Sequence, residues 1–142
     1  MQSSEKKLEI SLLLLRLGVF IVMFFWTLDK FLNPGHAAAV FSNFYLLEGL
    51  ESTAFVMIGS VQMLVVLGFA AGLFRPWTYG LVLAMHAIST FSSWKQYLEP
   101  FDNLLFFAAW PMLAACIVLF LLREDDRLLN LDAWRKGDLT GG

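Results

Sequence analysis

The chain has 142 residues, of which 58% are hydrophobic and 15% charged, and its formal net charge is −2. This composition is unsuited to a soluble globular domain, and no nucleic-acid partner is expected. We expect an all-α fold: one integral membrane domain over residues 1–142, a four-helix bundle in contact with the lipid bilayer. The expected spans are residues 10–32, 53–74, 77–94 and 104–122, each long enough at about 1.5 Å per residue to cross a hydrocarbon core of about 30 Å.

The first expected span carries ionisable side chains near both of its ends. Arg16 lies only about 9 Å inside the span, so its guanidinium is expected to extend toward the cytoplasmic head groups, or else to contribute to a ligand site. Asp29 and Lys30 are adjacent in sequence and do not face one another on a helix, so each needs a different partner. We expect Lys95 or His36 beside Asp29, and the acids Glu48, Glu51, Glu99 or Asp102 beside Lys30.

The connection between the first two spans contains apolar residues at helical spacing, namely Ala37, Val40, Phe41, Phe44 and Leu47. This pattern predicts a short amphipathic helix at the outer interface, either as a structural belt or as a lid over a site. Ionisable groups near it form an expected outer polar cluster, which is either a solvated rim or the entrance to a site: Asp29, Lys30, His36, Glu48 and Lys95.

The third span has a polar stripe at steps of three, four and seven residues, formed by Tyr79, His86, Ser89, Ser93 and either Gln96 or Tyr97. Polar groups are costly in hydrocarbon, so the stripe should face the bundle interior. His86 falls near the bilayer midplane, with Gln62 of the second span at comparable depth. His86 is interpreted either as a neutral imidazole bonded to a neighbouring helix or as a ligand or proton site. The candidate ligand-binding residues are His86, Gln62, Ser89, Ser93, Tyr79 and Arg16.

The fourth span contains Pro111, which predicts a kink, and the lone Cys116, which is expected to be a small buried core residue. Residues 123–142 form an expected cytoplasmic tail. In this tail Leu128, Leu131 and Trp134 are expected to lie on the inner leaflet, where Arg127, Arg135 and Lys136 would meet anionic head groups.

The distribution of basic residues predicts the orientation of the chain. Eight of the ten lysines and arginines fall at the N-terminus, the second connection and the C-terminus, against two near the first and third connections. This positive-inside bias places both termini in the cytoplasm and requires an even number of crossings.

The first span reads Arg16-Leu17-Gly18-Val19-Phe20 and continues to Trp26-Thr27-Leu28-Asp29-Lys30-Phe31-Leu32-Asn33-Pro34. It resembles the opening of DoxX-type membrane proteins, in which an arginine begins the helix and a lysine followed by an apolar residue ends it. Arg16, Gly18 and Lys30 match that pattern, and chain length and helix number are also similar. The resemblance implies a small bacterial inner-membrane subunit associated with quinone-linked oxidoreductases or redox homeostasis, which is a fold-level argument.

Three functions stay open from the sequence. The leading hypothesis is a membrane subunit or partner of an oxidoreductase that binds quinone or lipid near His86, with other subunits or a second copy of the chain as partners. The second is a structural or assembly subunit without a ligand, and the third is a small transporter or proton path. No covalent cofactor, no metal site and no catalytic residue is expected, so the chain is not expected to catalyse a reaction alone.

Overall fold

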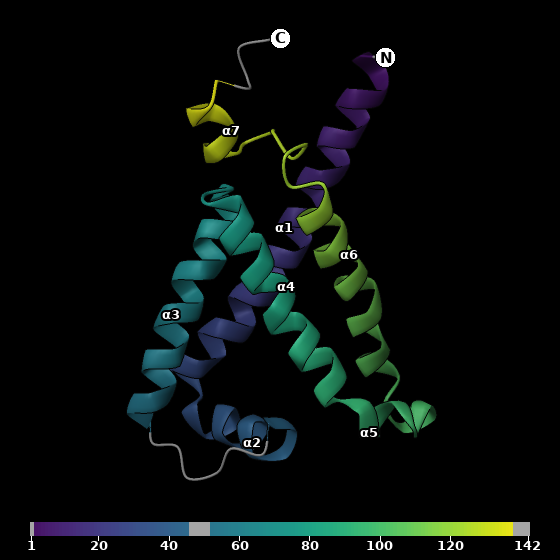
Figure 1. Ribbon diagram of the computed structural model, residues 1–142. Helices are drawn as coiled ribbons and strands as arrows, with labels where there is room; N and C mark the ends of the chain where they lie inside the picture. The colour runs from purple at the N-terminus through teal and green to yellow at the C-terminus, as the bar shows by residue number, and fades with distance from the viewer. Residues whose placement is uncertain (1, 46–51, 138–142) are drawn as a thin grey trace.

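The computed structural model describes residues 2–45 and 52–137 and is helical, with no strand in these two ranges (Figure 1). The longer helices arise from apolar runs that satisfy their backbone groups internally, as a membrane requires. The α-helices are α1 (Gln2–Leu32), α2 (Pro34–Tyr45), α3 (Ser52–Ala71), α4 (Arg75–Ser92), α5 (Trp94–Tyr97), α6 (Ala109–Leu121) and α7 (Leu131–Arg135), and the 3-10 helices are η1 (Pro100–Asp102) and η2 (Leu104–Ala108).

Three helical stretches of the described chain are long and apolar enough to cross a membrane: Ser3–Leu32, Thr53–Ala71 and Leu104–Leu121. The protein is therefore an all-α membrane helical protein. Helix α4 has 18 residues but does not reach the same apolarity, because polar side chains such as Tyr79, His86 and Thr90 lie along it. A fourth crossing by α4 stays a prediction.

The helices associate mainly as two pairs, α1 with α3 and α4 with α6. The N-terminal end of α1, the α3–α4 turn and α7 lie at one end of the molecule, and α2 and α5 lie at the other (Figure 1). We call these the α7 end and the α2 end. Helix α2 confirms the amphipathic helix predicted from sequence: Ala37 is buried, while Leu47 lies outside the described residues.

The core lies where the two pairs meet. Its fully buried side chains come from all four long helices and include Cys116, as the sequence predicted: Leu12, Val19, Met23, Val66, Phe69, Tyr79, Val82, Cys116 and Leu119. The outward faces carry many exposed large apolar side chains, as expected for helices surrounded by lipid.

A buried polar network at the α7 end ties the helices to the chain after α6. We call it the polar lock and define it as Arg16, Arg75, Tyr79, Asp126, Asn130 and Asp132. The Arg16 guanidinium, 1% exposed, donates to Asp126 Oδ2 at 3.0 Å and to the Tyr79 hydroxyl at 3.1 Å. It also donates to the carbonyl oxygens of Leu128 at 2.6 Å and Leu129 at 2.9 Å.

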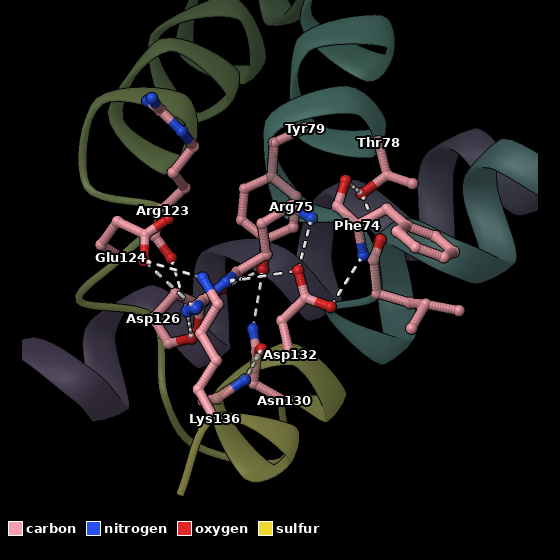
Figure 2. Close-up of polar contacts among 12 residues, drawn as sticks. Phe74, Arg75, Thr78, Tyr79, Arg123, Glu124, Asp126, Asn130, Asp132 and Lys136 are labelled. Carbon is pink, nitrogen blue, oxygen red and sulfur yellow. Dashed lines mark hydrogen bonds and ion pairs between the residues drawn. The ribbon is translucent and has the colours of Figure 1, made fainter. Parts of the chain in front are cut away.

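Figure 2 shows the part of the lock around Arg75 and Asp132. The Asp132 carboxylate accepts hydrogen bonds from the backbone N–H of Phe74 at 2.9 Å and of Arg75 at 2.8 Å, which caps the start of α4. The Arg75 guanidinium is fully buried and donates to the Arg123 carbonyl at 2.9 Å and the Asp126 carbonyl at 3.2 Å. The residues after α6 are therefore folded into the bundle.

The turn between α3 and α4 fits against the same network. Gly72 has a φ of 69°, in the left-handed region, and its carbonyl accepts the Asp132 N–H at 3.1 Å. A Cβ added there would overlap the Asn130 side chain. Asn130 donates to the Tyr79 hydroxyl at 3.2 Å and accepts the Ala133 N–H at 3.0 Å (Figure 2).

Candidate functional site

A large cleft lies between α1, α2, α4 and α6. Its volume is about 1240 Å³, and its lining is predominantly apolar. The cleft exists because α1 packs mainly against α3 and α4 mainly against α6, which leaves space between the pairs that α2 borders. Its apolar lining includes Leu15, Val22, Trp26, Val40, Phe41, Phe44, Met85, Phe106, Met112 and Ala115.

A small polar pocket of about 60 Å³ adjoins the cleft. The two cavities share six lining residues: Trp26, Lys30, Tyr45, Gln62, Met85 and Ser89. The polar pocket is completed by Met23, Thr27 and His86. An apolar cleft next to a few convergent polar groups is the usual form of a small-molecule site.

His86 is 1% exposed, and its ring is hydrogen-bonded to the backbone of α6. Its Nε2 lies 2.9 Å from the carbonyl oxygen of Ala109 and 3.2 Å from the Thr90 hydroxyl. The Trp26 ring lies against it, with ring centroids 6.0 Å apart and planes at 31°. The other ring nitrogen, Nδ1, is buried and has no hydrogen-bond partner within the described part of the chain.

Pro111, expected to kink the fourth span, lies in the first turn of α6, directly after the 3-10 helix η2. The change from 3-10 to α geometry therefore occurs beside Ala109, whose carbonyl binds His86. Proline is tolerated in a first turn because its missing N–H has no intrahelical acceptor there.

Three other predicted site residues lie around the same cavities. Gln62 and Ser89 line both of them, and Ser93 lines the cleft. The Gln62 Oε1 atom is buried and, like His86 Nδ1, has no hydrogen-bond partner among the residues described. The Ser93 hydroxyl donates to the Ser89 carbonyl at 3.2 Å, so part of its hydrogen-bonding capacity is used within α4.

The outer polar cluster forms only in part. His36 Nδ1 and Asp29 Oδ2 are 2.5 Å apart, which confirms the expected Asp29–His36 pair, and both residues border the cleft. Lys30 also borders it, with its Nζ 6.0 Å from the Phe41 ring; no ion pair joins it to the expected Glu99 or Asp102.

Lys95 is the other described member of the predicted outer cluster. The ammonium group of Lys95 lies over the Trp94 ring at 5.6 Å, and Lys95 does not line the cleft. Glu48, and Glu51 beside it, lie outside the described residues.

Arg16 and Tyr79 belong to the polar lock and line neither cavity. The expectation that Arg16 extends to the head groups is wrong, because Asp126 and the backbone beyond α6 meet its guanidinium inside the protein. The predicted contact of the tail with the inner leaflet stays a prediction: Leu131 and Trp134 are exposed, while Asp126, Asn130 and Asp132 of the same segment are buried against the bundle.

The two lock carboxyls have opposite pKa shifts. Burial raises the pKa of the Asp126 carboxyl above its usual value, against the Tyr79 hydrogen bond and the charges of Arg16 and Arg75. Burial also acts to raise the pKa of Asp132, but the two backbone N–H donors and the charges of Arg75 and Arg135 outweigh it, so this pKa is lowered.

Sequence reasoning missed several residues that shape the site. Trp26, Thr90 and the Ala109 carbonyl fix the position of His86. Tyr97, which the sequence placed on the polar stripe as an alternative to Gln96, borders the cleft, and its hydroxyl donates to the Thr90 carbonyl at 2.9 Å. Thr90 was detectable, because it lies four residues after His86 on one helix face. No group of three or more metal-ligating side chains comes together in residues 2–45 and 52–137.

The chain was compared with models of protein families, with curated proteins and with solved structures, and no match was found in any of the three. The resemblance of the first span to DoxX-type proteins stays a prediction.

Proposed function

We propose that this protein binds a quinone-type ligand within the membrane, as a subunit or partner of a quinone-linked oxidoreductase or redox-homeostasis complex in the bacterial inner membrane. In this proposal the ring lies where the cleft meets the polar pocket, with one oxygen substituent in the polar pocket beside His86, and the hydrophobic chain lies in the cleft. One observation carries it: a predominantly apolar cleft of about 1240 Å³ shares six lining residues with a buried polar pocket.

The size and lining of the cleft support an amphiphile with a long apolar part. Pockets for drug-sized ligands usually measure about 300–1,000 Å³, so this cleft has room for a ring and several isoprenoid units. Burial of each CH₂ group contributes about 0.8 kcal/mol, and Val22, Phe41 and Met112 provide such contacts along the cleft.

The polar pocket supports a ring with oxygen substituents. The Lys30 ammonium, the Gln62 amide and the Ser89 hydroxyl line it and can donate hydrogen bonds to ligand oxygens. Trp26 borders both cavities and offers an aromatic face to a flat ring. The electron acceptor or donor would be a partner protein, as the family resemblance implies.

The test is binding of decylubiquinone to the purified full-length protein in lipid nanodiscs, followed by quenching of tryptophan fluorescence. Gly18 lines the cleft, and a Cβ added there meets no atom within 4 Å, so Gly18→Leu adds bulk at the cleft wall with no clash at its Cβ. We expect saturable binding to the wild type and about tenfold or greater weakening in Gly18→Leu, because the leucine excludes several ligand CH₂ groups.

Leu81→Ala is the matched control, because Leu81 is 45% exposed on α4 and lines neither cavity. Its affinity should equal that of the wild type. Absence of saturable binding of both decylubiquinone and its reduced form to the wild type would refute the proposal and favour a structural subunit without a ligand. Equal binding by the wild type and Gly18→Leu would place the ligand outside the cleft.

A further inference from the structure

The hydrogen-bond geometry of His86 determines which ring nitrogen carries its proton. The Ala109 carbonyl can only accept, so the Nε2 atom 2.9 Å away must donate. Thr90 donates its hydroxyl hydrogen to the His86 carbonyl at 2.7 Å, so at 3.2 Å it too can only accept from Nε2. A neutral imidazole bonded in this way has its free lone pair on Nδ1.

The Nδ1 lone pair is a buried acceptor without a donor. No carboxylate contacts the ring among the described residues, so a neutral His86 avoids an uncompensated buried charge. Gln62, which lines the same small pocket, also has a buried Oε1 atom with no hydrogen-bond partner in the described ranges. A buried acceptor left unpaired loses its hydrogen bonds to water without replacement, so a ligand that brings O–H groups gains more here than one that brings only lone pairs.

We propose that the polar pocket selects the reduced, hydroxyl-bearing form of its ligand, a hydroquinone, over the oxidised quinone. This inference rests on the proposed function and specifies its substrate class. A ring hydroxyl donates to His86 Nδ1, whereas a quinone carbonyl would face that nitrogen lone pair to lone pair. Lys30 can donate to an oxygen of either form and does not discriminate between them.

The experiment compares decylubiquinol, kept reduced under anaerobic conditions, with decylubiquinone on the same nanodisc-embedded protein. We expect the quinol to bind about tenfold or more tightly, the ratio that one satisfied buried acceptor supplies. His86→Phe removes Nδ1 and should bring the two affinities together. His86→Gln lacks Nδ1, but its amide can still donate to the Ala109 carbonyl, so a loss of preference in this variant too assigns the effect to Nδ1 rather than to the lost Ala109 contact.

The outcomes separate this inference from the proposed function. If both forms bind equally to the wild type, or the quinone binds more tightly, the inference is refuted and the proposed function stands. If a quinol preference persists in His86→Phe, Nδ1 is not its cause and the inference is again refuted. If neither form binds, the proposed function itself fails. A preference that disappears in His86→Phe and is unchanged in Leu81→Ala supports the inference.

Discussion

Removal of the Asp126 carboxylate tests whether the polar lock holds the fold together. Asp126 is fully buried and accepts hydrogen bonds from the Arg16 guanidinium and the Tyr79 hydroxyl. In Asp126→Ala the 1% exposed Arg16 keeps its bonds to Tyr79 and to two carbonyls but loses its carboxylate. Removing one partner of a buried ion pair costs about 3–5 kcal/mol, so we expect a loss of that size in the free energy of unfolding.

The measurement is SDS-induced unfolding in mixed micelles, followed by tryptophan fluorescence. Glu124→Ala is the matched control in the same segment, because Glu124 pairs with Arg75 at 3.3 Å and Lys136 at 3.6 Å but is 58% exposed. Its loss should be below about 1 kcal/mol. Replacing Arg16 by Met together with Asp126→Leu should recover much of the stability, since no unpaired buried charge is left.

The stability losses of Asp126→Ala and Glu124→Ala together test whether the polar lock stabilises the fold. If Asp126→Ala costs no more than Glu124→Ala, the lock does not stabilise the fold. If the double replacement is no better than Asp126→Ala, the cost does not come from leaving the Arg16 guanidinium unpaired.

Two further predictions concern the same end of the molecule. Gly72→Ala should lower the free energy of unfolding by about 2 kcal/mol or more, because alanine at a φ of 69° is strained and its Cβ meets Asn130. The control is Gly18→Ala, whose Cβ meets no atom within 4 Å and which should cause no loss in the same assay. The lowered pKa of Asp132 means that its stabilisation is fully present above its unfolded value of about 4 and is lost as the pH falls through the folded pKa. The Tm of the wild type should therefore fall more steeply below pH 4 than the Tm of Asp132→Asn. Parallel plots of Tm against pH for the two proteins would contradict this.

Much of the helical architecture was predictable because apolar periodicity is a local signal. Apart from the start of the first span, the span ends lie within three residues of those predicted, and the amphipathic α2 and the burial of Cys116 also follow from this signal. Helix α1 starts at Gln2 rather than residue 10, because the Lys and Glu residues before the apolar run are good helix formers that a hydropathy pattern does not detect. The placement of His86 and Gln62 around one pocket followed from their similar depth.

The lock was not predictable by the same reasoning, because its partners are far apart in sequence. Arg16 and Asp126 are separated by 110 positions, and nothing local to Arg16 distinguishes a guanidinium that reaches head groups from one that is buried in an ion pair. The same holds for Arg75 and Asp132, which are 57 positions apart. The short polar tail gave the only signal, since buried arginines require carboxylates and Asp126 and Asp132 were available there.

The lock also changes how the charge distribution should be interpreted. Arg16 and Arg75 are two of the eight basic residues counted toward the cytoplasmic side, yet both are buried and satisfied within the protein. When these two arginines are left out of the count, six basic residues lie on the predicted cytoplasmic side and two on the other side. The bias that predicts cytoplasmic termini therefore persists among the remaining basic residues.

The position of the lock relative to the cleft explains how one small bundle can be stable and still leave a large internal space. Polar contacts from Arg16, midway along α1, and from Arg75, at the start of α4, join these helices to the segment after α6. With the two helix pairs fixed there, the rest of their length does not need close packing, and the cleft opens between them beside α2. Concentrating the polar stabilisation at one end thus leaves the remaining interface apolar and wide enough for a ligand.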